Sequence, residues 1–277
     1  MTKAKAVMSP TSPEDKDEKN IRDSSPELRK EDASKYRGLA ARLNYLALDR
    51  TDLQFAAKQV AKNMSCPRQH DWEKLKRVAR YLVGAPRMIQ KFVWQEPQTD
   101  VITHTDSDWA GDKSTRKSTS GGVMMMGMHM IKSWSSTQQV LALSSGEAEL
   151  YALLKGASQM KGLMSQLAEW GITAKGIAKT DASAAMGMAH RQGLGRTRHI
   201  DVQYLWIQDE LKQEKLQMKK VKTDENPADM FTKGLKPEVV ESYMQEMGCK
   251  TSQERAKSAL RIEAVSKRKR KPEEPVE

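Results

Sequence analysis

Four acidic residues of this chain lie at positions where the pattern of apolar residues around them predicts the edge of a hydrophobic core. Asp106 closes an alternating strand pattern, and Asp181 directly follows the apolar run at 176–180. Glu149 falls at the edge of the apolar face of a predicted helix, and Asp229 lies on the first turn of another. A charged side chain in such a place is costly unless it is paired or bound to a cation.

The residue types narrow the chemistry of these four positions. Carboxylates that converge on one cleft repel one another unless divalent cations lie between them. Oxygen ligands without His or Cys favour Mg2+ or Mn2+ over Zn2+. Two such ions, about 3.5–4 Å apart, promote in-line displacement at phosphorus, because one activates water and the other stabilises the leaving oxygen. The four acids therefore predict a two-ion site for phosphodiester chemistry.

Two neighbouring acids need separate interpretations. The Asp-Ser-Asp stretch at 106–108 is also a common turn composition, and Asp108 competes with Asp106 for the role of first ligand. Glu147 follows Ser144 by three residues, as in a capping box, so we interpret it as part of a helix cap.

The elements that would position the four acids follow one another in a regular order. The sequence predicts strands over 101–105, 121–126 and 130–134, a helix over 144–170, a strand over 176–180, helices over 182–190 and 202–211, and a strand over 216–221. Two final helices follow, a short one opened by residues 224–229 with Asp229 on its first turn, and one over 237–247. Because short turns connect the first three strands, we expect an antiparallel meander followed by helix–strand–helix units. The predicted fold class is therefore α/β with a mixed sheet, in a domain over residues 98–248.

The segments on either side of this domain differ from it in composition. Residues 1–35 carry 8 basic and 8 acidic side chains and few large apolar ones, which predicts a disordered leader. Residues 36–97 carry 12 basic and 5 acidic side chains at helical spacing, with a short strand expected at 90–94. This basic excess fits a helix that lies along a nucleic-acid backbone, and a solvated basic face is the competing interpretation. Residues 249–277 form a charged tail.

Weaker features of the sequence indicate where in the cell the protein acts. The basic run at 267–271 is typical of a nuclear import signal, and a nonspecific nucleic-acid tail is the alternative. The two cysteines, Cys66 and Cys249, imply neither a disulfide framework nor a zinc site, which suits a reducing compartment. Because no signal peptide or long apolar run is present, we expect an intracellular protein, cytoplasmic or nuclear, without a membrane segment.

Six short segments resemble a known family in their residues, order and spacing. They are Thr-Asp-Ser-Asp-Trp-Ala-Gly-Asp at 105–112, Arg-Lys-Ser-Thr-Ser-Gly at 116–121, Ser-Trp-Ser-Ser at 133–136, Ala-Leu-Ser-Ser-Gly-Glu-Ala-Glu at 142–149, Arg-His-Ile-Asp-Val at 198–202, and Glu-Asn-Pro-Ala-Asp-Met-Phe-Thr-Lys at 225–233. Together they resemble the ribonuclease H domain of copia-type LTR retrotransposon polyproteins. Residues 36–94 resemble the end of the reverse transcriptase that precedes this domain, so the likeness covers about residues 36–240.

The resemblance implies a ribonuclease H-like fold with an N-terminal helical extension, and an endonuclease that hydrolyses the RNA strand of an RNA–DNA hybrid. Asp106 would contact both Mg2+ ions (or Mn2+), Glu149 and Asp181 one each, and Asp229 would be an outer ligand. Selection for RNA would rest on contacts to the 2′-hydroxyl, for which the candidates near the acids are Ser107, Ser145 and Ser183.

Two departures from the family pattern keep other functions open. No His lies between Val221 and Asp229, although many ribonucleases H carry one there; copia-type domains commonly lack it too. The catalytic Asp pair of a polymerase has no counterpart. A reverse transcriptase polymerase domain would then be a separate partner. The alternatives are a nucleic-acid-binding domain without activity and a module for polymerase assembly, both derived from a truncated retroelement. The fold alone does not distinguish these functions.

Overall fold

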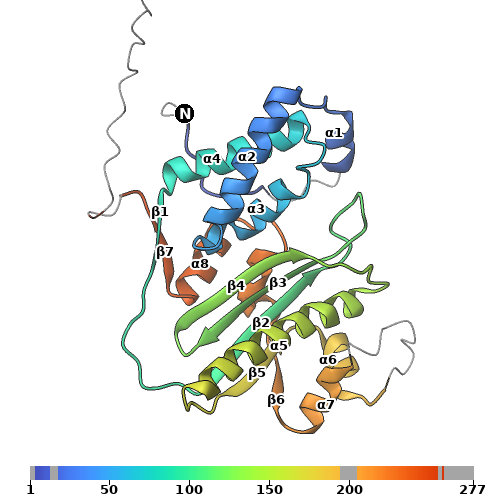
Figure 1. The fold of residues 1–277 in the computed structure, drawn as a ribbon, viewed down its shortest axis with the longest axis vertical. Coiled ribbons are helices and arrows are strands. Elements are labelled where there is room, and N and C mark those ends of the chain that lie inside the picture. Colours follow the sequence, from blue (N-terminus) through green and yellow to red (C-terminus); the bar gives the residue numbers. More distant parts are fainter. Residues whose placement is uncertain (1–3, 13–17, 194–204, 255–257, 259–277) are drawn as a thin grey trace, which may run out of the picture.

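The computed structural model describes residues 4–12, 18–193, 205–254 and 258, and a five-stranded sheet lies at its centre (Figure 1). Its strands are β2 (Asp100–Asp108), β3 (Thr119–Met126), β4 (His129–Thr137), β5 (Lys175–Thr180) and β6 (Leu216–Lys220). They lie in the order β4-β3-β2-β5-β6. β2, β3 and β4 are antiparallel neighbours, whereas β5 and β6 run parallel to β2. This topology confirms the predicted mixed sheet and the ribonuclease H-like fold.

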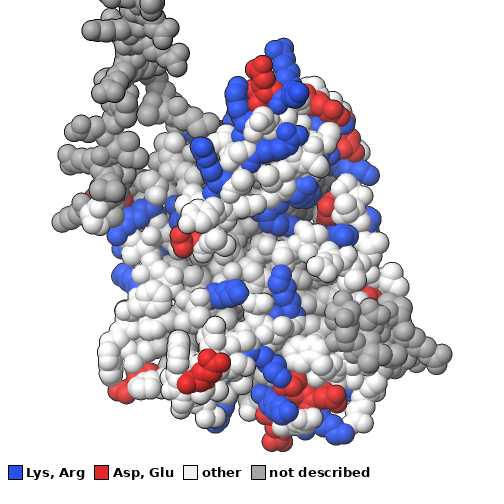
Figure 2. All heavy atoms as spheres, in the orientation of Figure 1, with Lys and Arg blue, Asp and Glu red and all other residues white. Residues whose placement is uncertain are grey.

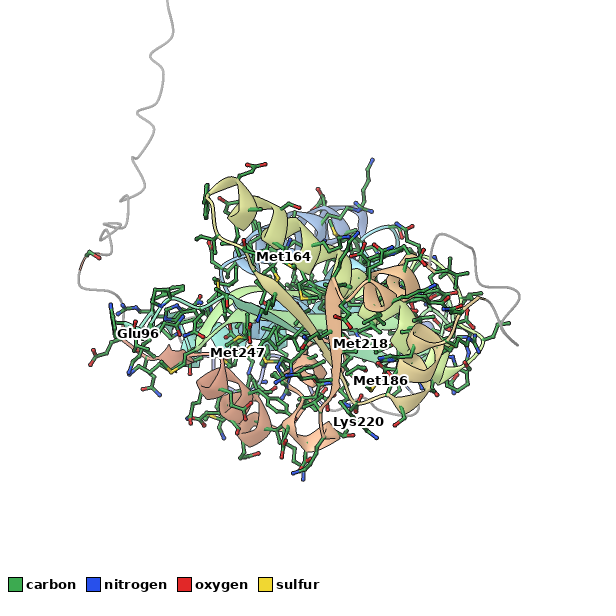
Figure 3. The ribbon with its side chains drawn as sticks, turned by 90° about the horizontal axis from the view of Figure 1, so that it is seen from below. Glu96, Met164, Met186, Met218, Lys220 and Met247 are labelled. Atoms are coloured by element: carbon green, nitrogen blue, oxygen red, sulfur yellow. The ribbon has the colours of Figure 1, made fainter. Side chains whose placement is uncertain are left out.

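Helices cover both faces of the sheet. α5 (Ser145–Glu169), α6 (Ser183–His190) and α7 (Trp206–Lys212) share one apolar core with the sheet, and α8 (Pro237–Glu246) and the 3-10 helix η4 (Pro227–Phe231) share another. Because side chains alternate along a strand, Val123 of β3 enters the core under α8 while Met124 enters the core under α5. Figure 3 shows Met164 of α5 and Met247, just after α8, on opposite sides of the sheet.

A separate helical module precedes the sheet. It comprises α2 (Lys30–Leu46), the 3-10 helix η1 (Thr51–Leu53), α3 (Gln54–Ala61) and α4 (Gln69–Gly84), which pack around their own apolar core. α3 lies against β4, where Ser133 hydrogen-bonds to Thr51 at 2.7 Å and to Gln54 at 2.9 Å, in each case through its hydroxyl. The predicted N-terminal helical region is thus present and contacts the sheet.

Part of the predicted disordered leader is ordered against this module. Helix α1 (Glu18–Ser24) lies within the predicted leader, and α2 begins at Lys30 rather than near residue 36. Arg22 of α1 pairs with the buried Asp71 of α4 at 3.3 Å, and Leu28 packs against the core of the module. A few long-range contacts therefore order a segment whose composition predicts disorder.

The two ends of the predicted domain also differ from the expected boundaries. The strand expected at 90–94 is β1 (Arg87–Gln90), and it pairs with β7 (Cys249–Ser252) at the start of the predicted tail. This antiparallel pair joins one segment that precedes the central sheet in the sequence to one that follows it. The composition of neither segment predicts the pairing.

Several sequence predictions fall outside the described residues. They include the segment 198–202, the start of the helix predicted over 202–211 and the basic run at 267–271. Within the part of the chain that the structure describes, no helix combines the length and apolarity needed to cross a membrane.

Candidate metal site

The pairing of β2 with β5 brings the first two acids together. The two strands are parallel, and His104 lies opposite Lys179. Asp106 and Asp181 each lie two residues further along the chain, so both carboxylates project from the same edge of the sheet. The register of β2 and β5 thus explains why Asp106, at the end of an alternating sequence pattern, and Asp181, after an apolar run, belong to one site.

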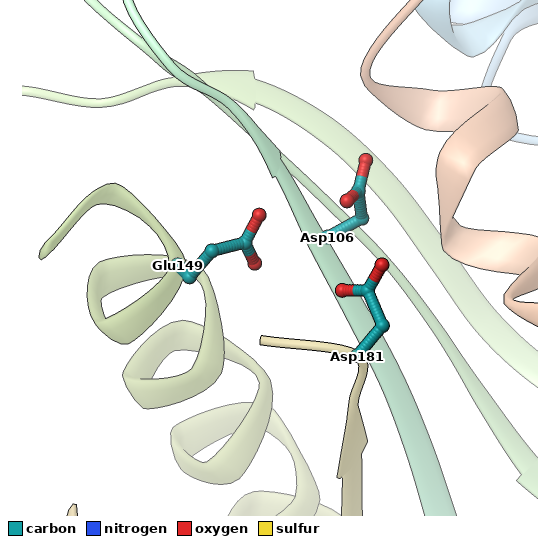
Figure 4. Close-up of side chains that lie close together, drawn as sticks. All are labelled: Asp106, Glu149 and Asp181. Atoms are coloured by element: carbon teal, nitrogen blue, oxygen red, sulfur yellow. The ribbon is translucent and has the colours of Figure 1, made fainter. Parts of the chain in front are cut away.

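Helix α5 adds the third acid by packing tightly on β2. A Cβ at Gly156 would lie 2.4 Å from Cγ2 of Thr105, so a larger residue there would hold the helix away from the strand. With glycine, Glu149 reaches β2, and its Oε1 accepts a hydrogen bond from the backbone N–H of Ser107 at 3.2 Å. Figure 4 shows the side chains of Asp106, Glu149 and Asp181 converging, and one carboxylate oxygen from each lies within 4.8 Å of the others.

The fourth acid, Asp229, comes from η4 on the opposite face of the sheet. A Cβ at Gly121 would lie 2.8 Å from Cβ of Phe231, so this glycine of β3 lets η4 approach. The fully buried Asn226 caps η4 and donates a hydrogen bond from Nδ2 to the carbonyl oxygen of Thr105 at 3.0 Å. This bond anchors the segment one residue from Asp106, and Asp229 lies close enough to Asp106 for the two carboxylates to affect each other's charge.

The electrostatics of the acids reflect this crowding. Burial, with the nearby Asp106 and Asp181, raises the pKa of Glu149 to about 9. Burial and Asp106 raise the pKa of Asp229 to about 7. Oε2 of Glu149 and Oδ1 of Asp229 are buried and have no hydrogen-bond partner among the described residues. Clustered carboxylates with unsatisfied oxygens fit a hard divalent cation such as Mg2+ or Mn2+.

Two residues without a role in the sequence prediction also belong to the site. Oγ1 of Thr232 donates a hydrogen bond to Oδ2 of Asp106. Nζ of Lys233 lies 2.8 Å from Oδ2 of Asp229. The available signal was the spacing of Asp229 and Lys233, because side chains four residues apart in a helical turn face each other.

The competing acids occupy other places. Asp108 is not a member of the three-residue cluster, and its side chain fills the space over Gly111, where a Cβ would lie 1.5 Å from Oδ2 of Asp108. Glu147 is fully buried and accepts hydrogen bonds from the backbone of Leu143 at 2.9 Å and from the hydroxyl of Tyr151 at 2.7 Å. The hydroxyl of Ser144 accepts a hydrogen bond from the backbone N–H of Glu147, which is one half of the expected capping box, but the Glu147 carboxylate bonds to the backbone of Leu143 instead of that of Ser144.

The three candidate serines differ in their relation to the acids. Ser107 contacts Glu149 through its backbone N–H. Ser145 is the first residue of α5 and is exposed, and Ser183 accepts a hydrogen bond from Lys220 at 2.7 Å.

Positive charge surrounds the acids and continues over the helical module. Lys58 of α3 lies close enough to Asp108 to lower the pKa of its carboxyl, although burial outweighs this effect and raises that pKa. Figure 2 shows Lys and Arg side chains spread over the helical module in the upper part of the view.

Two plant retrotransposon polyproteins are similar to the chain in sequence. The retrovirus-related Pol polyprotein from transposon RE1 of Arabidopsis thaliana is 32% identical over 221 residues, which make up 78% of this chain and 15% of that polyprotein. The one from transposon TNT 1-94 of Nicotiana tabacum is 34% identical over 186 residues, 66% of this chain and 14% of that polyprotein. The chain thus spans a small part of the length of each.

Other comparisons add a shorter relative and a solved structure. Secreted RxLR effector protein 161 of Plasmopara viticola is 32% identical over 114 residues, 41% of this chain and 80% of that protein. The structure of LC11-RNase H1, isolated from compost, is 13% identical and covers 48% of this chain and 93% of its own, with a TM-score of 0.36. No protein-family model matches the chain.

Proposed function

Because the chain belongs to the family of copia-type retrotransposon Pol polyproteins, we propose that it is a magnesium-dependent endonuclease that hydrolyses the RNA strand of RNA–DNA hybrids. The observation that carries this proposal is the convergence of Asp106, Glu149 and Asp181, with Asp229 beside them, at one edge of a ribonuclease H-like sheet. An acidic cluster with unsatisfied oxygens can promote phosphodiester hydrolysis, because metal ions held there would stabilise the charge that develops at phosphorus.

The residues of the chain divide this work among them. Asp106, Glu149 and Asp181 would hold the ions, and Asp229 would supply the oxygen of an outer ligand. Thr232 orients Asp106 by its hydrogen bond, and the backbone N–H of Ser107 orients Glu149. Lys58 lies at the rim of the site, where it could neutralise a phosphate of the bound strand.

The proposed partners follow from the same family. An RNA–DNA hybrid would be the substrate, and a reverse transcriptase polymerase domain would supply that hybrid. The helical module would represent the end of such a polymerase, and the protein would act in the cytoplasm or the nucleus.

Nucleic-acid binding without cleavage is a second candidate function. The Plasmopara viticola relative carries the name of an effector rather than of a polymerase, which supports a role without catalysis. The basic helical module supports binding whether or not the acids hold metal ions.

The experiment is cleavage of a labelled RNA–DNA hybrid by the purified chain in Mg2+, in Mn2+ and in EDTA. We expect metal-dependent cutting of the RNA strand, no cutting of duplex DNA or duplex RNA, and a loss of at least about a hundredfold in Asp106→Asn, because the removed charge contacts the ions. Hybrid binding without cutting in either metal would replace the nuclease by the second candidate.

A further inference from the structure

We propose that a polar cavity beside the acidic cluster binds a backbone phosphate of a nucleic acid, and that Lys155 supplies the positive charge of this site. The cavity has a volume of about 450 Å³ and lies between the start of β3, the end of β4, helix α5 and the start of α7. The inference deepens the proposed function, because it names a second contact for the same substrate. It requires that the chain binds nucleic acid, but not that it cuts it.

The first observation is the chemistry of the cavity lining. Hydroxyl, amide and ammonium groups line it together with aromatic rings, and the residues used below are Ser120, Ser136, Gln138, Tyr151, Lys155 and Trp206. Among the described residues, Lys155 is the only charged one that lines the cavity. A single positive charge surrounded by hydrogen-bond donors fits an anionic group such as a phosphate.

The second observation is that the charge of Lys155 is not neutralised by an acid. Its Nζ donates a hydrogen bond to Oγ of Ser136, and within the described ranges no carboxylate pairs with it. Burial and the nearby Lys132 lower the pKa of Lys155. By contrast, Lys161 further along α5 pairs with Glu210 at 2.6 Å. Because a half-buried charge favours a counter-charge, an anion in the cavity would stabilise the Lys155 ammonium.

The third observation is a row of serines that connects the cavity to the acids. Ser107 of β2 lies opposite Ser120 of β3, and Ser120 lies opposite Ser136 of β4. Nε2 of Gln138 donates hydrogen bonds to Oγ of Ser120 at 2.9 Å and to Oγ of Ser107 at 3.4 Å. Neighbouring strands lie about 4.8 Å apart, so Ser136 is about 10 Å from Ser107, the residue that follows Asp106.

A nucleic-acid strand fits this spacing. One strand of a duplex advances by about 3.4 Å per nucleotide, so a strand held at the acids covers 10 Å within about three nucleotides. Lysine, serine, tyrosine and glutamine side chains commonly contact backbone phosphates, and such contacts fix the register of the strand. We therefore assign the cavity to a phosphate other than the one that is cut. Lys155 would position the strand and take no part in hydrolysis.

The first experiment measures the affinity for a labelled RNA–DNA hybrid at several salt concentrations. Binding is measured in EDTA, where no metal-dependent cutting occurs, and again in Mg2+ with Asp106→Asn in every protein. Loss of one lysine–phosphate contact lowers the slope of log affinity against log salt concentration by about one. We expect this smaller slope in Lys155→Gln, with affinity at low salt at least about tenfold weaker. Lys155→Arg should retain the affinity and the slope.

Lys175 provides a matched control for the loss of one positive charge. It is exposed and begins β5, whereas Asp181 directly follows the end of that strand. Lys175→Gln therefore removes the same charge at the opposite edge of the sheet and should bind the hybrid as the wild type does. A purely structural role for Lys155 would weaken binding without lowering the salt slope.

The second experiment identifies the phosphate. Single uncharged methylphosphonate linkages are placed along the DNA strand of the hybrid and, in a second set, along the RNA strand. At one position the linkage should weaken binding by the wild type about tenfold and have no effect on binding by Lys155→Gln. That position shows which strand, and which nucleotide of it, contacts the cavity.

Each outcome decides the proposal. Wild-type affinity and slope in a folded Lys155→Gln protein overturn it, as does an equal loss in Lys175→Gln. Binding of inorganic phosphate that needs Lys155, without any change in hybrid affinity, would assign the cavity to a free phosphate and also overturn it. If Lys155→Gln does not fold, Lys155→Met decides, because it keeps the apolar stem.

The nuclease proposal is tested separately. Absence of hybrid binding by the wild type in EDTA and by Asp106→Asn in Mg2+ overturns the assignment of the cavity. The cleavage assay with the wild type decides whether the chain is a nuclease, whatever the result for Lys155.

Discussion

At the residue scale, the buried carboxylates of the acidic cluster destabilise the metal-free protein when they are charged. Glu149 is held between β2 and its own helix with one oxygen bonded to Ser107 and the other without a partner among the described residues. Its pKa is raised to about 9 chiefly by burial and by Asp106 and Asp181. The charged form of this side chain is therefore disfavoured until a cation binds.

This raised pKa predicts how stability depends on pH. Between the ordinary pKa of 4.5 and about 9, the folded protein binds a proton on Glu149 that the unfolded chain has lost. Stability in EDTA should therefore fall as pH rises through this window. In Glu149→Gln, which resembles the protonated acid, the fall should be smaller. Thermal unfolding in EDTA should show similar melting temperatures for both proteins near pH 5 and a higher one for the variant near pH 8.5.

Addition of Mg2+ at pH 8.5 supplies the control for this prediction. The ion should raise the melting temperature of the wild type more than that of Glu149→Gln, because only the wild type offers a carboxylate at position 149. Parallel pH profiles of the two proteins in EDTA would contradict the assigned cause.

The acids could be picked out from the sequence because each interrupts a local pattern, whereas no local pattern marks Thr232, and only the four-residue spacing from Asp229 points to Lys233. Asp106 and Asp181 stand out at strand ends, and Glu149 stands out on a largely apolar helix face. Thr232 and Lys233 follow a short 3-10 helix, where a polar residue is unremarkable. Their importance arises from η4 lying against β3, a long-range contact that no local pattern records.

At the element scale, close packing of α5 on β2 sets the distance between Glu149 and Asp106. Thr105 lies beneath Gly156 on the strand, and Thr103 lies further along the same face. A second glycine of the helix, Gly162, has no atom within 4 Å of the position its Cβ would take. The two glycines therefore offer a matched test of how helix position governs the site.

We expect Gly156→Ala to destabilise the protein and to weaken Mg2+ binding, because the added methyl group would force α5 away from β2. Overpacking of this kind typically lowers the free energy of unfolding by about 1–3 kcal/mol. Gly162→Ala should instead raise it by about 0.5–1 kcal/mol and leave Mg2+ binding unchanged, because alanine favours the helix without a clash. Denaturant unfolding and calorimetric titration measure the two quantities. Equal effects of the two substitutions would mean that packing at Gly156 does not position Glu149.

The order of elements could be predicted from sequence, but some of their partners could not. Alternating and apolar runs indicated the strands that became β2 to β6 and the helix that became α5. The β1–β7 pair joins residues 87–90 to residues 249–252, and α1 depends on an ion pair across 49 positions. Such contacts need the tertiary structure, since each segment alone has too few apolar residues to predict its partner.

At the scale of the whole molecule, the helical module and the sheet form a continuous contact surface. Ser133 of β4 hydrogen-bonds to Thr51 and Gln54, and Lys62, directly after α3, pairs with Asp112 at 3.4 Å. The Arg50–Asp52 pair, 2.7 Å apart and buried, holds the segment that carries Thr51. The module is therefore fixed against β4, which β3 separates from β2, the strand that bears Asp106.

This contact predicts that the module and the sheet unfold together. The wild type should show a single calorimetric transition, because separating the two parts would leave the polar groups around Ser133 without their partners. Ser133→Glu places a larger charged side chain into this contact and should divide the transition into two. Ser165→Glu makes the same change at an exposed position of α5 and should retain one transition. A single transition at the wild-type temperature in Ser133→Glu would show that the contact does not couple the two parts.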